Sequence, residues 1–157
     1  MALVHKSSLR RTLLVGLAAS LAVGSAARAQ TNASSDRKGA AMRLRFAFAD
    51  QEFTATLEDN PSSHDLFSMV PLDLTIEDYS TNEKITYLPR KLSEEGSGAF
   101  DNEQPGDLCY YAPWGNLAFF HAGYRWSRGL IRLGRIDGSS EPLAVRGKFL
   151  LTIRRAA

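Results

Sequence analysis

The sequence predicts a mainly β protein, built as a small closed or nearly closed β-barrel of about eight strands with one or two short helices. Short runs in which apolar and polar residues alternate recur along residues 42–155, as in strands with one buried face. Turn-forming residues separate these runs at short intervals. Closing such a sheet into a barrel removes its exposed edges, which favours a barrel over an open sheet.

The elements can be assigned in chain order. Alternating residues over 42–49 and 51–57 predict two strands joined by a tight turn at Asp50 and Gln51. Asn60 suits the cap of a helix and Pro61 its first turn, so a short helix over 65–70 is expected, closed by Pro71. A long surface loop is expected over 93–106, which is rich in Gly, Ser, Glu and Asn. The remaining strands are expected at 72–77, 84–88, 107–112, 116–121, 130–136 and 147–153.

The first 29 residues have the pattern of a cleavable export signal. Lys6, Arg10 and Arg11 precede an apolar segment over 12–23, which is too short and too rich in Ala and Gly for a transmembrane span. Ala27-Arg28-Ala29 then supplies the small residues of a cleavage site before Gln30. We therefore expect a bacterial protein that is periplasmic or secreted, with no membrane span after cleavage.

Two export routes fit this segment. The arginine pair followed by Thr12-Leu13-Leu14 resembles a twin-arginine signal, whose substrates cross the membrane folded. General secretion is the alternative. Residues 30–41 are small and polar and predict a disordered linker, so the barrel domain is expected to cover 42–155.

The charge of the chain changes when the signal is removed. The formal net charge is +2, but residues 1–29 hold four basic residues and no acidic one, which leaves 15 basic and 17 acidic residues. The remaining chain therefore gives no support for nucleic-acid binding. Residues 120–157 hold eight basic and two acidic residues. These cations either pair with acidic neighbours or form a basic rim for an anionic ligand, made by Arg125, Arg128, Arg132 and Arg135.

Recognisable catalytic, metal and cofactor patterns are missing from the sequence. Cys109 is the one cysteine, which excludes an intramolecular disulfide, and its apolar surroundings predict a buried side chain rather than a nucleophile. His64 and His121 lack metal-ligand spacing. Glu83 and Lys84 are adjacent, so a strand places them on opposite faces and they form no acid–base pair. We expect neither a metal nor a cofactor.

Three blocks, in this order, carry a family resemblance. They are Leu-Glu-Asp-Asn-Pro at 57–61, Asp-Tyr…Glu-Lys…Tyr-Leu-Pro over 78–89, and Gly-Asp…Tyr-Tyr-Ala-Pro-Trp-Gly-Asn-Leu-Ala over 106–118. With Gly129-Leu130 and Leu133-Gly134-Arg135, they resemble the small bacterial cyclophilin-like domain family. The resemblance implies a cyclophilin-type β-barrel and no established activity.

Cyclophilins proper are peptidyl-prolyl isomerases that use an arginine in a Phe-His-Arg motif beside an apolar proline pocket. Here Phe120-His121 is followed by Ala122, so that arginine has no counterpart in the motif. Isomerase activity therefore rests on fold analogy.

Aromatic residues with polar tips provide the best candidate binding site. They predict a groove that binds a small molecule or an extended peptide, and its residues are Tyr79, Tyr87, Tyr111, Pro113, Trp114, Asn116 and Phe120. The alternatives are a prolyl isomerase and an accessory domain for a redox protein, whose contact surface would be the basic C-terminal stretch.

Overall fold

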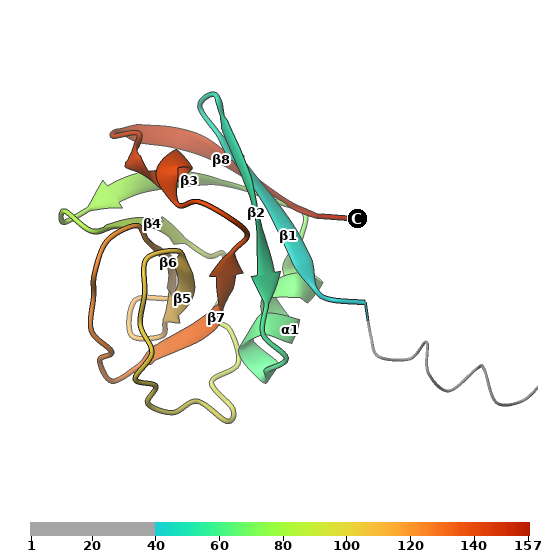
Figure 1. The fold of residues 1–157 in the computed structure, drawn as a ribbon. Helices are drawn as coiled ribbons and strands as arrows, with labels where there is room; N and C mark the ends of the chain where they lie inside the picture. The colour runs from blue at the N-terminus through green and yellow to red at the C-terminus, as the bar shows by residue number, and fades with distance from the viewer. Residues whose placement is uncertain (1–39) are drawn as a thin grey trace, which may run out of the picture. The chain divides into compact units, whose positions relative to one another are not determined.

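The computed structural model describes residues 40–157 and shows a closed antiparallel β-barrel (Figure 1). Its strands are β1 (Arg43–Phe48), β2 (Gln51–Leu57), β3 (Leu72–Tyr79), β4 (Glu83–Tyr87), β5 (Asp107–Tyr111), β6 (Asn116–Phe120), β7 (Leu130–Ile136) and β8 (Lys148–Arg155). A helix, α1 (Pro61–Met69), follows β2, and a 3₁₀ helix, η1 (Glu141–Ala144), precedes β8. The predicted mainly β barrel of eight strands is confirmed. The export signal predicted at 1–29 lies outside the described residues, as do residues 30–39 of the predicted linker.

The strands follow each other around the barrel in the order β1-β2-β7-β5-β6-β4-β3-β8, and β8 pairs with β1 to close it. The first and last strands are therefore neighbours, with Phe46 opposite Ile153. On the other side of β1, Phe46 lies opposite Phe53 of β2. This order places β4, β6, β5 and β7 side by side, and these four strands carry the candidate site.

Aromatic and aliphatic side chains fill the interior of the barrel. The Phe46 ring stacks on Phe53 with 5.1 Å between ring centroids and meets Phe119 edge-on at 5.3 Å. The charged side chain of Lys84 is fully buried, and its Nζ donates to Asp78 Oδ1 at 2.8 Å. A buried charge requires such a partner because its loss of hydration is costly. Lys84 is thus a core residue, while the neighbouring Glu83 faces the other side of the sheet.

Helix α1 begins where the sequence predicts a cap. The Asn60 side-chain oxygen accepts a hydrogen bond from the Ser63 N–H at 2.9 Å, and Pro61 occupies the first turn. The helix covers Pro61–Met69, so it begins four residues before the expected 65–70 segment. The Ser63 hydroxyl donates to the Leu133 carbonyl at 2.8 Å, which ties α1 to β7, beside which it lies in Figure 1.

Strands β2 and β7 approach each other so closely at Gly134 that no larger residue fits there. Gly134 lies opposite Leu57, and a Cβ atom added to it would be 2.8 Å from Leu57 Cα. The pairing of β2 with β7 therefore depends on glycine at position 134, which has no side chain.

Candidate functional site

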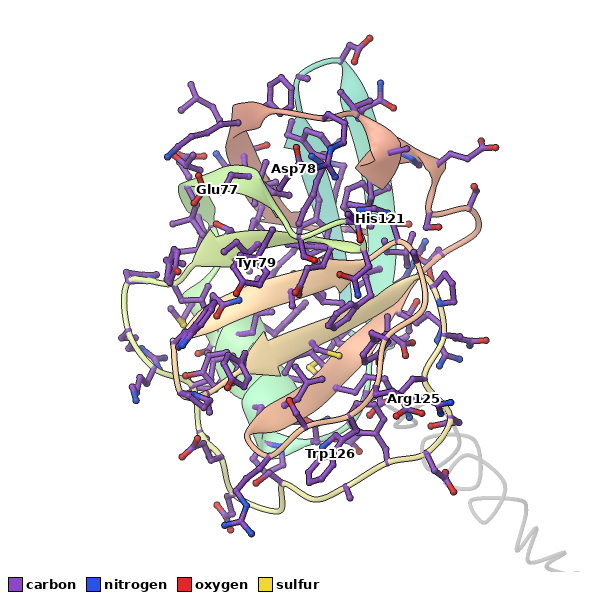
Figure 2. All side chains as sticks on the ribbon, turned by 90° about the vertical axis from the view of Figure 1, so that its left-hand side faces the viewer. Glu77, Asp78, Tyr79, His121, Arg125 and Trp126 are labelled. Atoms are coloured by element: carbon purple, nitrogen blue, oxygen red, sulfur yellow. The ribbon has the colours of Figure 1, made fainter. Side chains whose placement is uncertain are left out.

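The outer face of strands β4, β6, β5 and β7 carries an apolar cluster, although outward positions of a small barrel usually meet water. Its buried apolar residues form a cluster separate from the barrel core: Ile85, Cys109, Ala118, Phe120 and Leu130. Figure 2 views this face, with the segment that carries Arg125 and Trp126 along one edge and Tyr79 on the opposite side. The pattern explains why all five residues of β6 are buried, three outside and two inside the barrel.

The segment 121–129 lies against this face and is held there by side-chain hydrogen bonds. The Tyr124 hydroxyl donates to Asp107 Oδ2 at 2.6 Å, and the Trp126 N–H donates to Glu103 Oε1 at 2.8 Å. Asn82 Nδ2 donates to the Gly123 carbonyl at 3.1 Å at the start of the segment. Because burial raises the pKa of Tyr124, its hydroxyl keeps its proton and remains a donor. The segment is therefore a fixed wall.

Between this wall and the strands lies a cavity of about 360 Å³. That volume falls at the small end of the range for ligand sites, roughly 300–1,000 Å³. Outward residues of β4 and β6 form much of its lining, and side chains from β3, the β3–β4 turn, β5, the β5–β6 turn, 121–129 and the start of β7 complete it. The lining residues are Tyr79, Asn82, Glu83, Ile85, Tyr111, Trp114, Asn116, Ala118, Phe120, Tyr124, Arg125, Ser127 and Leu130.

Aromatic rings line the cavity in two groups. Trp114 meets Tyr79 edge-to-face with centroids 5.3 Å apart at 87°, and meets Tyr111 at 5.5 Å and 77°. Phe120 and Tyr124 stack in parallel at 3.6 Å. Tyr79 and Trp114 remain 43% and 47% exposed. Partly exposed rings in such an arrangement offer π faces to an incoming group.

Asn116 contributes a buried polar atom that lacks a partner. Its side chain is 2% exposed, and Nδ2 donates to the Leu117 carbonyl at 3.1 Å. Its Oδ1 accepts no hydrogen bond from any residue in the described part of the chain. A buried acceptor left unsatisfied costs about 1–3 kcal/mol, so Asn116 Oδ1 is suited to a ligand donor.

Glu83 is the acidic group of the cavity. Burial raises the pKa of its carboxyl to about 7, and the carboxyl forms no ion pair within residues 40–157. Arg125, from the opposing wall, is the cavity's basic residue. The site therefore holds a carboxyl that changes charge near neutral pH, a cation and several aromatic faces.

The structure brings together five of the seven residues predicted for the groove: Tyr79, Tyr111, Trp114, Asn116 and Phe120. Tyr87 and Pro113 are not part of the cavity lining. Tyr87 points outward at the end of β4 and is 51% exposed, while Pro113 packs against Gly129. Whether the five residues bind a ligand remains a prediction.

Sequence reasoning did not include Glu83, Tyr124 or Ser127 in the groove, and it gave Arg125 only as part of a basic rim. Glu83 and Lys84 face opposite sides of β4, as the sequence predicts, but their adjacency does not indicate that Glu83 lies beside the aromatic residues. Asn116, Ala118 and Phe120 alternate along one strand and therefore share one of its faces. Pairing of β4 with β6 adds Glu83 to the same face. Tyr124 and Arg125 lie in an irregular segment, where no periodicity marks the side that faces the protein.

The arginines proposed as a basic rim have different environments. Arg132 Nε donates to Glu58 Oε1 at 2.6 Å, and Arg135 Nε donates to Asp107 Oδ1 at 2.6 Å. For these two, the structure favours pairing with acidic neighbours. Arg125 lines the cavity described above, and Arg128 lies on a separate, smaller one.

Other reactive groups lie outside the cavity. Burial raises the pKa of the Cys109 thiol to about 12, so it is not a thiolate near neutral pH. His64 Nε2 lies 2.6 Å from Asp59 Oδ1 on the surface. Within residues 40–157, no His, Cys, Asp and Glu side chains form a group of three that could hold a metal ion. No helix in that range combines the length and apolarity needed to cross a membrane.

Comparisons with known proteins identify the family. The solution structure of a hypothetical protein from Archaeoglobus fulgidus is similar, with a TM-score of 0.58 and 20% sequence identity over 76% of this chain and 98% of that chain. At this identity the likeness shows the fold alone. No curated protein sequence matches significantly. The family model described as the cyclophilin-like family matches residues 46–154, so the chain belongs to the cyclophilin-like family.

Proposed function

We propose that this protein is a binding module that holds a small organic molecule in the cavity on the outer face of β4, β6, β5 and β7. The observation that carries the proposal is Asn116 Oδ1, a buried acceptor without a partner in residues 40–157, on the wall of an aromatic cavity. A folded protein leaves such an atom unsatisfied at a cost in stability, and a ligand donor removes that cost.

The size of the cavity favours a small molecule over an extended peptide. A volume of about 360 Å³ suits one ring with a short substituent. The hydrogen bonds of Tyr124 and Trp126 fix one wall, so the space does not depend on rearrangement of that segment.

Ligand-observed NMR with four single-ring probes tests this proposal. Benzylamine, benzamide, benzyl alcohol and benzoate share a ring and differ in charge and hydrogen bonding. We expect saturation transfer to at least one probe, lost in Trp114→Ala and weakened in Asn116→Ala. Tyr87→Ala is the matched control, since Tyr87 is exposed on the same sheet but outside the cavity. Equal signals from Trp114→Ala and the wild type would contradict the site.

Prolyl isomerisation is a second candidate, favoured by one observation. Arg125 lines the cavity with Phe120, which places an arginine beside an apolar surface although the Phe-His-Arg motif is missing. A protease-coupled prolyl assay should then show a rate above buffer that falls in Arg125→Gln. A wild-type rate equal to that of buffer excludes this function.

We further propose that the protein is exported after cleavage behind Ala29, on the pattern of residues 1–29. Mass spectrometry of the exported protein should give Gln30 as its first residue. Replacing Arg10 and Arg11 by Lys should block export by the twin-arginine route and leave general secretion largely intact. A cell-associated, uncleaved chain contradicts export.

A further inference from the structure

The acidic residue of the cavity is unpaired in the described part of the chain, although Arg125 also lines the cavity. Glu83 is half-buried beside Ile85 and Phe120, and its carboxyl forms no ion pair with any residue of the described range. Carboxylates removed from water are normally paired, because the loss of hydration is otherwise uncompensated. A cation with hydrogen-bond donors would therefore complement this carboxylate.

The aromatic residues beside Glu83 suit a cation as well. Tyr79 lies opposite Glu83 in the β3–β4 pair, so the ring and the carboxyl extend from neighbouring positions. The Tyr79 ring contacts Trp114 edge-to-face, and both rings are more than two-fifths exposed. Ring faces attract cations by about 0.5–2 kcal/mol, with the larger values in desolvated sites.

We propose that this cavity selects an organic monocation, a protonated amine whose N–H groups donate to the Glu83 carboxylate and whose apolar part packs against Tyr79 and Trp114. This inference rests on the proposed function and names the ligand class of that same cavity. It predicts a preference for charge, which a general aromatic site does not show.

The other charged groups near Glu83 leave this assignment intact. Lys84 is buried inside the barrel, where Asp78 accepts from its Nζ. His121 lies close enough to this pair that burial, Arg146 and Lys84 together lower its pKa, so it is neutral near pH 7. In the cavity itself, the Tyr124 hydroxyl stays protonated. Arg125 is then the one basic side chain in the lining, and it opposes a bound cation.

Calorimetric titration of the whole chain with benzylamine, benzyl alcohol and benzoate at pH 8 tests the preference. The amine should bind about tenfold or more tightly than the alcohol, because a hydrogen bond to a charged group exceeds a neutral one by this order. Benzoate should bind most weakly. The affinity for benzylamine should also rise about tenfold from pH 6 to pH 8, as Glu83, with a pKa of about 7, ionises.

Two variants of similar size separate charge from shape. Glu83→Gln should remove both the amine preference and its pH dependence, while Arg125→Gln should strengthen benzylamine binding by removing repulsion. Near-UV circular dichroism confirms that both variants are folded. Benzyl alcohol binding as tightly as benzylamine, or unchanged amine binding in Glu83→Gln, overturns the inference. If alcohol binding is then lost in Trp114→Ala, the proposed function stands without it, whereas no binding of any probe overturns both.

Discussion

Replacing Glu83 by Gln should stabilise the ligand-free protein, and the gain should depend on pH. Burial raises the pKa of this carboxyl from 4.5 to about 7 in the folded protein. Between these pH values the folded protein holds a proton that the unfolded chain has released. The free energy of unfolding therefore falls as pH rises from about 4.5 to about 7, and the penalty is fully present above that range.

The size of this effect follows from the shift. A rise from 4.5 to about 7 has a ceiling of about 3.4 kcal/mol, at 1.36 kcal/mol for each pKa unit. Since the side chain is only half-buried, screening by solvent reduces this to about 1–2 kcal/mol. Glutamine keeps the shape of the side chain and cannot ionise. The free energy of unfolding of the variant should therefore exceed that of the wild type by about 1–2 kcal/mol at pH 8.

Urea unfolding at pH 5 and pH 8 measures the gain. Only the difference between variant and wild type is informative, because other groups titrate in the opposite sense: the hydrogen bond from Arg90 lowers the pKa of Asp65. Glu94→Gln is the matched control, since Glu94 is exposed and should give no pH-dependent gain. A Glu83→Gln variant with the same advantage at both pH values, or with less stability than the wild type at pH 8, refutes the reasoning.

Three further predictions concern the barrel and the segment 121–129. Asp78→Ala should lower the unfolding free energy by about 3–5 kcal/mol by leaving buried Lys84 unpaired, and Lys84→Met should cost clearly less in the same urea titration. Gly134→Ala should cost about 1–3 kcal/mol, measured as a lower midpoint of thermal unfolding, because its Cβ collides with the β2 backbone. Tyr124→Phe should cost about 1–3 kcal/mol and speed amide exchange over 121–129, since buried Asp107 loses a donor.

Local pattern predicted the strands well because each has one face that must be buried. The bounds of β2 and β7 match the expected 51–57 and 130–136, and the other strands differ by one or two residues at their ends. The cap at Asn60 and Pro61 was also confirmed. The 3₁₀ helix η1 was missed because Ser140, Glu141 and Pro142 are equally typical of a turn.

The site was predictable only where it lies on strands and their turns. Trp114 and Asn116 were found because aromatic and polar residues cluster around one turn of the sequence. Tyr124 could not be found, because its position depends on a hydrogen bond to Asp107, which is 17 residues away. Arg125 was predicted only as part of a basic rim, and nothing local indicates its place beside the aromatic residues. Glu83 becomes a site residue only when β4 pairs with β6 and places it opposite Phe120. Such contacts between distant segments leave no local pattern.

The cavity and the barrel core lie on opposite sides of the same strands. Substitutions in 121–129 that keep Tyr124 and Trp126 can therefore reshape the cavity without disturbing the phenylalanine packing around Phe46. The shape of the cavity and the packing of the barrel core are therefore separable in this chain. A library confined to that segment, with Tyr124 and Trp126 kept as anchors, would turn the barrel into a scaffold for selecting new binding specificities.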